Sequence, residues 1–178
     1  MIKLQTPLNK EDIKKLKIGD LVYLSGTIYT ARDQAHKRLE KLIINNEPLP
    51  FDLNNSIIYY TGPTPTKPGT IIGSCGPTSS YRMDSFMDLL GTHGLLASIG
   101  KGDRSDIVID LCQKHQMIYF VITGGIGAKI SKCVTKSEII AFEDLGTEAI
   151  RKLEVKDLPI IVAYDTMGNN IFGGNKND

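Results

Sequence analysis

The sequence predicts an α/β fold built on a mixed β-sheet, and three observations support this prediction. From Leu95 onward, short apolar runs alternate with helical patterns, which is typical of strands joined by helices in a partly parallel sheet. The part before Leu95 is richer in strand-like runs, so we expect a β/β/α arrangement rather than a regular doubly wound sheet. Hydrophobic residues make up 41% of the 178 residues, enough for a core without disulfides or a structural metal.

The first half of the chain carries clear helix start signals. Asn9 with Asp12 three residues later predicts a short capped helix, and Thr30 with Asp33 predicts the start of a helix over residues 31–44. The other elements expected here are strands at residues 21–29, 56–61 and 70–74 and a helix at about 78–90, with Gly91 as the residue after its end.

The second half alternates more regularly. It is expected to contain strands at residues 95–99, 117–123, 138–142 and 158–165 and helices at residues 107–115 and 144–153. The glycine-rich segments 100–103 and 124–127 predict turns. We expect residues 1–178 to form a single domain with a frayed polar tail at 173–178.

Composition excludes several classes of function. The formal net charge is +1, so there is no electrostatic footprint for nucleic acid or for an anionic membrane surface. No apolar run is long enough to span a membrane, and the N-terminus lacks the apolar region of a signal peptide. Cys75, Cys112 and Cys133 are an odd set without paired spacing, which favours free thiols in a reducing compartment. We therefore expect a cytoplasmic protein.

Arg32 is the first candidate for ligand binding. The expected helix at 31–44 places it in the first helical turn, where the helix dipole disfavours a cation and an anionic ligand would offset that cost. The alternative is an ion pair with Asp33 or Asp52. His36 lies one turn further on, and we favour a packed or supporting role for it over a catalytic one.

Two further turns carry polar or cationic residues after a strand. The segment 73–84 combines a Gly76-Pro77 turn with four hydroxyl side chains, among them Thr78, and with Arg82. One helix cap does not need four hydroxyls, although capping is the alternative explanation. Lys101 stands between two glycines and is exposed to whatever approaches that turn, unless the turn is simply solvated. Ligands of open α/β sheets bind at the carboxyl ends of strands, where these turns lie.

Two other signals are weak. Gly125 and Gly127 follow a strand, but Ile130 occupies the third glycine position of a dinucleotide-binding motif, and no phosphate-binding Gly-Lys-Ser/Thr occurs. The three cysteines come from unrelated segments, which argues against an iron–sulfur cluster held by this chain.

Three motifs together resemble one enzyme family. Thr30-Ala31-Arg32-Asp33 with His36, Gly76-Pro77-Thr78 through Arg82-Met83-Asp84, and Lys101-Gly102 are similar to the class I, iron–sulfur-dependent fumarate hydratases. The match is to their β subunit, equivalent to the C-terminal domain of the single-chain forms, and it covers nearly the whole chain. The β subunit of L-tartrate dehydratase is the close relative. That subunit more often has Cys where this chain has Ala31, which favours fumarase.

The resemblance implies a swivelling β/β/α domain that acts as part of a hydro-lyase. It implies that the active site is shared with an α subunit, which holds a [4Fe–4S] cluster, and that this chain supplies no metal ligand. The expected assembly is a hetero-oligomer with that α subunit, or a dimer of this chain on its own. The residues implied are Arg32 and Arg82 for binding the dicarboxylate substrate, Thr78 and Lys101 for catalysis, and Asp33, His36, Gly76 and Asp84 for support.

The residues themselves leave alternatives open. An isolated Thr hydroxyl is a very weak acid and a poor base, so Thr78 is a more secure active-site residue than it is a base. Tartrate or a related hydroxy-diacid is the alternative substrate. A non-catalytic anion-binding module is the alternative of another class, and nucleotide binding is a distant one.

Overall fold

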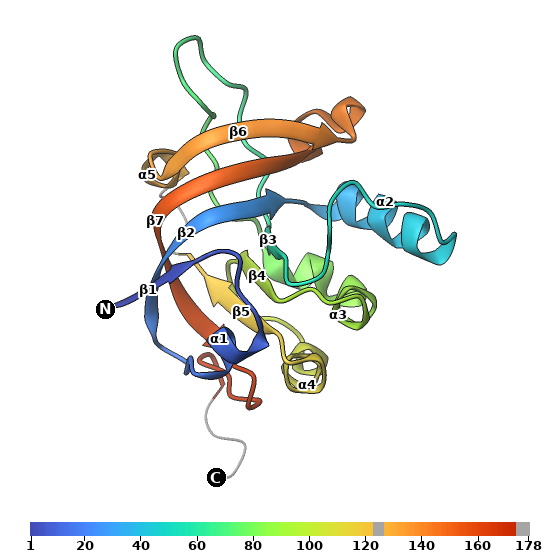
Figure 1. Cartoon of the computed structure of the whole chain (residues 1–178), viewed down its shortest axis with the longest axis vertical. Coiled ribbons are helices and arrows are strands. Elements are labelled where there is room, and N and C mark those ends of the chain that lie inside the picture. Colours follow the sequence, from blue (N-terminus) through green and yellow to red (C-terminus); the bar gives the residue numbers. More distant parts are fainter. Residues whose placement is uncertain (123–126, 174–178) are drawn as a thin grey trace.

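Residues 1–122 and 127–173 are described by the computed structural model, and their strands form one mixed sheet (Figure 1). Its order is β1-β2-β3-β4-β5-β7-β6, and β2 also pairs with β7. The strands are β1 (Ile2–Gln5), β2 (Leu21–Thr30), β3 (Ile57–Tyr59), β4 (Ala97–Gly100), β5 (Ile118–Val121), β6 (Val134–Ala141) and β7 (Ile150–Tyr164). The mixed α/β class expected from the sequence is confirmed.

The helices are short. The α-helices of the described ranges are α1 (Lys10–Lys14), α2 (Asp33–Ile44), α3 (Met87–Thr92), α4 (Asp106–His115) and α5 (Gly127–Ser131). The 3-10 helices there are η1 (Ser80–Phe86) and η2 (Glu143–Glu148). No helix in these ranges is both long and apolar enough to cross a membrane.

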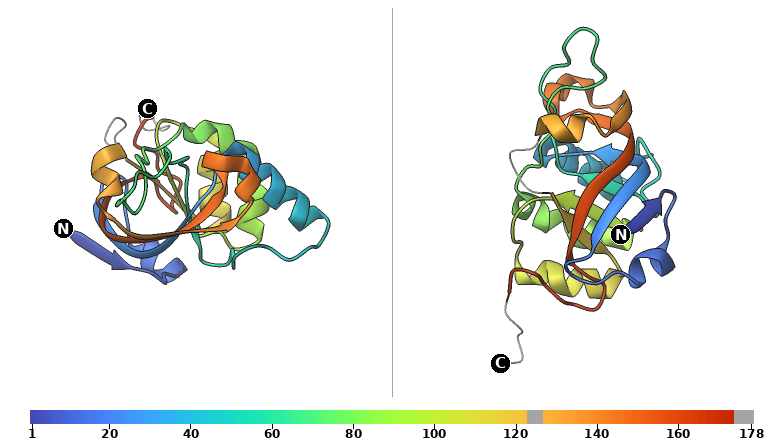
Figure 2. Two further views of the ribbon diagram at one scale, coloured as in Figure 1. Left: turned by 90° about the horizontal axis from the view of Figure 1, so that it is seen from above. Right: turned by 90° about the vertical axis from the view of Figure 1, so that its left-hand side faces the viewer.

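Strand β7 closes the sheet on itself. Strands β1 to β5 pair in parallel with their neighbours, whereas β7 runs antiparallel to β2, β5 and β6. Because β7 pairs with both β2 and β5, the strands from β2 to β5 and β7 form a partly closed, barrel-like arrangement (Figure 2). The helices α2, α3 and α4 gather on one side of it (Figure 1).

The helix expected at residues 144–153 is wrong. Only Glu143–Glu148 turns, and Ile150 already begins the 15-residue strand β7, which absorbs the strand expected at 158–165. Leu153 and Val155 are buried in the core while Glu154 between them is not, which is the alternation of a strand. The strand expected at 138–142 exists but begins earlier, at Val134.

Other expected elements also differ. Residues 70–74 form no strand, because the loop that holds them folds back on itself through a bond from Thr64 N to Ser74 O (2.9 Å). The expected helix at 78–90 is split into η1 and α3, and Gly91 lies inside α3 rather than after it. Strand β1 was not expected at all. The turn predicted at 124–127 and the frayed tail lie almost wholly outside the described residues.

Apolar side chains fill both faces of the sheet. Ile57 and Tyr59 of β3 face one core cluster together with α1 and the loop before η1, whereas Ile58 and Tyr60 face a second cluster with α2, η1, α3 and α4. A strand buried on both faces needs a continuous apolar run, as the sequence of β3 and of β5 has. Strands β3 and β4, which are buried along their whole length, are therefore held from both sides.

Gly26 in the middle of β2 offers a test of this packing. Its φ is +109°, and an added Cβ would lie 2.0 Å from Thr6 Oγ1, which itself accepts a bond from Thr27 N. We expect Gly26→Ala to lower the free energy of unfolding by roughly 2–4 kcal/mol, from backbone strain plus overpacking. Gly19→Ala is the matched control, since Gly19 also has a positive φ (+85°) but open space at its Cβ, and should cost about 1–2 kcal/mol. Urea denaturation measures both, and equal losses would contradict the overpacking argument.

Candidate active site

The carboxyl ends of three neighbouring parallel strands meet where two of the residues singled out by the sequence, Arg32 and Lys101, lie. β2, β3 and β4 pair in this order, so their carboxyl ends meet at one edge. Arg32 lies just beyond β2, Gly62 follows β3, and Lys101 directly follows β4. In Figure 1 this edge of β2 faces the start of α2. The topology therefore brings distant parts of the sequence to one place.

The turn that contains Thr78 is bonded to two of these strand ends. Thr78 N donates to Tyr60 O (2.7 Å), directly beyond β3. Ser80 N donates to Lys101 O (3.1 Å), and Ser79 forms an isolated parallel bridge with Lys101. Thr78 and Lys101 thus lie on backbone segments that are bonded to neighbouring strands and to each other. The hydroxyl-rich segment is fixed here by its backbone.

Arg32 is the N-cap residue of α2. The prediction that it lies in the first helical turn is therefore wrong. Its backbone is extended (φ −113°, ψ −162°), while Thr30, expected to be the cap, ends β2 and accepts a bond from Arg151 N. Arg32 packs on Gly62, where an added Cβ would lie 3.0 Å from Arg32 Cδ and 3.1 Å from Nη1.

The ion-pair partner of Arg32 is neither of the two carboxylates considered as alternatives from the sequence. Its Nε lies 4.0 Å from Glu148 Oε1 and has no hydrogen-bond partner within the described ranges, although it is buried. Neither Asp33 nor Asp52 is the recorded partner, and sequence analysis missed Glu148 because it sits in η2, within the stretch expected to be a helix. A buried guanidinium nitrogen without a partner has a donor to offer to an anion.

Arg82 is paired across the site. Its Nε donates to Asp33 Oδ1 (3.0 Å), so one of the two carboxylates considered as alternative partners of Arg32 binds Arg82 instead. About half of the Arg82 side chain is exposed. Because this bond joins η1 to the first turn of α2, Arg82 lies on the same side of the site as Arg32.

Glycines let the backbone approach closely around Lys101. A Cβ on Gly100 would lie 1.9 Å from Ser80 Oγ, and Gly102 has a φ of +82°. The Lys101 side chain is exposed and has no carboxylate within 4.0 Å in the part of the chain described. The Gly76 carbonyl accepts a bond from Thr61 Oγ1 (2.7 Å), which ties the turn before Thr78 to the segment that follows β3.

His36 is buried beneath Arg32. Its Nδ1 lies 2.8 Å from Arg32 O, and because a carbonyl only accepts, Nδ1 carries the proton. Among residues 1–122 and 127–173, its Nε2 has no hydrogen-bond partner, and the ring packs on Tyr60 and Phe86. Burial lowers the pKa of His36 to about 4, and the positive charge of Arg104 adds to this. His36 is therefore neutral at pH 7 and supports the N-terminus of α2.

Asp84 binds a residue that sequence analysis passed over. Its Oδ1 accepts a bond from Arg104 Nε (2.7 Å) and its Oδ2 one from Ser105 N (2.9 Å). The Arg104 side chain is fully buried. The sequence showed Arg104 only as the end of a glycine-rich turn, and nothing in a single sequence shows that such an arginine is buried. Asp84 therefore faces the protein interior.

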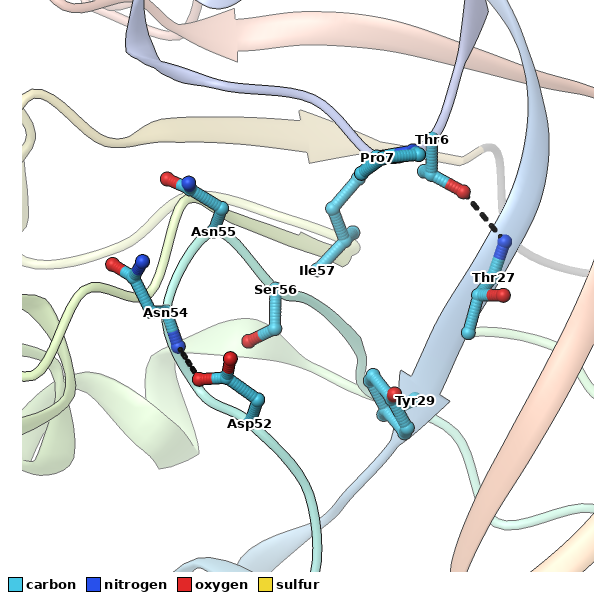
Figure 3. A pocket seen from close by; sticks show the side chains of 9 residues that line it. All are labelled: Thr6, Pro7, Thr27, Tyr29, Asp52, Asn54, Asn55, Ser56 and Ile57. Carbon is cyan, nitrogen blue, oxygen red and sulfur yellow. Dashed lines mark hydrogen bonds between the residues drawn. The ribbon is translucent and has the colours of Figure 1, made fainter.

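A separate cavity lies away from these residues. It measures about 250 Å³ and is formed by the β1–α1 connection, β2 and the segment before β3 (Figure 3). The Asp52 carboxylate lines it and accepts a bond from Asn54 N (3.0 Å). None of the residues implied by the motifs lines this cavity.

The cysteines do not form a metal site in the described ranges. No group of three or more Cys, His, Asp or Glu side chains is placed there to hold a metal ion. Cys75 and Cys112 are buried, and burial raises the pKa of their thiols to about 11 and about 12. Both thiols are therefore protonated at pH 7.

Comparison with known proteins gives a consistent assignment. The model of the family described as fumarase C-terminus matches residues 1–174. Fumarate hydratase 2 of Leishmania major is 38% identical over 175 residues, which is 96% of this chain and 31% of that protein. A putative L(+)-tartrate dehydratase subunit beta of Methanocaldococcus jannaschii is 40% identical, over 93% of this chain and 88% of that protein. The L(+)-tartrate dehydratase subunit beta of Escherichia coli is 35% identical, over 97% and 87%. The chain thus spans less than a third of the fumarate hydratase and most of each β subunit.

The buried His36 makes stability depend on pH. Its pKa is about 4 in the folded chain and 6.5 in the unfolded chain, so between these values the unfolded state binds more protons. The free energy of unfolding should therefore fall as pH decreases from about 6.5 to 4. His36→Asn keeps an N–H donor for Arg32 O but does not titrate, so the stability difference between wild type and variant should shrink over this range. Denaturation midpoints at several pH values measure it, and a constant difference would contradict the assignment.

Proposed function

The chain belongs to the fumarase C-terminus family, and from this premise we propose that it is the β subunit of a two-subunit hydro-lyase that reversibly hydrates fumarate to malate. Its coverage of 88% and 87% of two proteins named subunit beta supports a separate subunit. The observation that carries the proposal is the set of cations, Arg32, Arg82 and Lys101, around the Thr78 turn at the ends of three parallel strands. We also propose a single domain of the swivelling β/β/α kind.

The substrate is a small dianion, and the cations suit it. Arg32 and Arg82 each bind one carboxylate, since a guanidinium offers two parallel N–H donors to the two oxygens. The Arg32 side chain is 27% exposed, so it is partly accessible. The exposed ammonium of Lys101 stabilises the negative charge that develops on a carboxylate in the reaction.

The reaction moves a proton and a hydroxyl group. In the direction of dehydration, a base removes the proton next to a carboxylate, and the C–H bonding pair becomes the carbon–carbon double bond. The C–O bond breaks with its electron pair on oxygen, and the hydroxide that leaves takes up a proton to become water. Thr78 lies beside this carbon in the proposal, and a Thr hydroxyl needs help from another group to act as a base. We assign that help to the α subunit.

The [4Fe–4S] cluster implied by the resemblance belongs to the α subunit in this proposal. It would act as a Lewis acid on the hydroxyl group. With the cluster assigned to the α subunit, the roles proposed for the residues of this chain are substrate binding and charge stabilisation. Tyr81 (63% exposed) next to Arg82, and Ile71 (51% exposed), offer apolar surface for the α subunit to cover.

L-tartrate is the second candidate substrate. The fumarate hydratase and the two tartrate dehydratase subunits are similar to this chain at 38%, 40% and 35% identity, so identity does not separate them. The Ala31 side chain, at the position that favoured fumarase, is buried in the core and influences the substrate only through packing. A non-catalytic anion-binding module is the candidate of another class.

Anaerobic turnover tests the function. We expect no conversion of malate to fumarate with this chain alone and conversion after a cluster-loaded α subunit is added, followed by absorbance of fumarate. A complex that converts tartrate but not malate would keep the site and change the substrate. Tight fumarate binding by the isolated chain, with no turnover in the mixture, would favour the binding module.

Removing either arginine should abolish most turnover. We expect Arg32→Ala and Arg82→Ala to lower kcat/KM about 10²-fold or more, because each loses charge-assisted bonds to a carboxylate. Arg38→Ala is the matched control, since Arg38 on α2 pairs with Asp144 at the surface, and it should keep near-wild-type turnover. Circular dichroism checks that the variants remain folded. An alanine variant with full turnover would exclude that arginine from substrate binding.

A further inference from the structure

We propose that the buried ion pair between Arg104 and Asp84, the clasp, is a positioning device that holds Lys101 in register with the segment of Thr78 and Arg82. Asp84 follows Arg82 in η1, and Arg104 follows Lys101 in the loop after β4. The pair therefore joins the two segments that carry three of the four proposed active-site residues. The catalytic consequence rests on the proposed function, whereas the structural consequence does not.

The Arg104 guanidinium is bonded through all three of its nitrogens. Besides the Nε bond to Asp84 Oδ1 (2.7 Å), Nη1 donates to Ser98 Oγ (3.1 Å) and Nη2 to Tyr60 Oη (3.3 Å). Its central carbon lies 5.2 Å from the Tyr60 ring centroid and 4.9 Å from that of Tyr119. Burial alone would lower the pKa of Arg104, but Tyr60 and Asp84 outweigh it and raise the pKa, so the group stays charged.

Tyrosines fix the loop on either side of the clasp. Tyr119 Oη lies 2.7 Å from Gly102 O and 2.7 Å from Ser80 Oγ. Because a carbonyl only accepts, Tyr119 donates to Gly102, and the Ser80 hydroxyl can donate to Tyr119. Arg104 N donates to Tyr164 Oη (2.7 Å). Each residue that follows Lys101 in the loop is thus held by a buried side chain or is a part of the clasp.

A structural role alone does not explain an ionic clasp. Burying an ion pair costs desolvation free energy, and replacing the pair by apolar side chains of similar volume often keeps or raises stability. What an apolar pair lacks is direction: the carboxylate of Asp84 binds both Arg104 Nε and Ser105 N, which sets the position of the loop relative to η1. Lys101 precedes this fixed point by three residues. A shift of about 1 Å in a catalytic group can cost about 10²-fold in rate.

The test replaces both charges together. Asp84→Asn with Arg104→Met removes the ion pair without leaving a buried unpaired charge, so the double variant should fold and bind the α subunit, whereas each single variant should be less stable. We expect the complex of the double variant to keep its melting temperature within a few degrees and to lose at least 10-fold in kcat, with a smaller change in KM. A stable double variant with wild-type kcat would overturn the proposal.

Two further variants keep the test decisive. Tyr119→Phe keeps the ring but removes the donor to Gly102 O, and it should also lower kcat. It replaces the double variant as the test if the double variant does not fold. Asp88→Asn is the matched control, because Asp88 accepts from His115 Nε2 (2.7 Å) and joins α3 to α4, not to the Lys101 loop. Its kcat should equal that of wild type. Wild-type kcat in Tyr119→Phe would count against the clasp.

Hydrogen exchange separates this proposal from the proposed function. In the assembled complex, amides of residues 100–105 should exchange faster in the double variant than in wild type, and Asp88→Asn should leave them unchanged. This readout needs no substrate. If wild type converts neither malate nor tartrate while exchange changes as expected, the proposed function fails and the clasp stands. Unchanged exchange at residues 100–105 would refute the clasp.

Discussion

The pairing of β7 with both β2 and β5 is the constraint on which the rest of the structure depends. β2 lies along β7 from Leu21 to Tyr29, and β5 lies along the C-terminal part of β7. This closes the parallel strands into a curved sheet whose two faces are both covered, one by α1 and the loop before η1 and the other by α2, η1, α3 and α4. Closure fixes the tilt and register of β2, β3 and β4, so the three strand ends at the site cannot move independently.

Positively charged side chains gather at the carboxyl ends of these strands. Arg32, Arg82 and Lys101 come from three segments, and Asp33 and Glu148 partly neutralise them. Asp33 accepts a bond from one nitrogen of Arg82, and Glu148 lies 4.0 Å from one nitrogen of Arg32, while each guanidinium group has further N–H donors. Neutral His36 supports the Arg32 carbonyl beneath this surface without adding another positive charge. An anion is the ligand that such an arrangement favours.

Much of this could be predicted from the sequence, and the failures have physical reasons. The alternation of elements, the capped α1 and the C-terminal end of α2 at Ile44 follow from local signals such as Asn9 and Asp12. The helix predicted at residues 144–153 was wrong because the same mixture of charged and apolar residues suits a helix or a half-buried strand. Pairing with a neighbouring strand decides between the two structures. Ile2–Gln5 is a strand because β2 is beside it, which no local pattern shows. The partners of Arg32 and Arg104 depend on long-range packing. The motifs identify the cationic residues, but the parallel order of β2, β3 and β4 is what brings their segments together.

The contacts of the loop between Lys101 and Arg104 also restrict insertions and deletions during evolution. Each of its residues is tied to a partner elsewhere in the fold, so inserting or deleting one residue would rotate either Lys101 or Arg104 away from its position. The loop before η1 is under no such restriction near Gly69, where an added Cβ meets nothing and the chain turns through a local bond from Thr70 to Lys67. Length variation among descendants of this chain is thus expected to accumulate around residue 69, while the spacing between positions 101 and 104 stays constant.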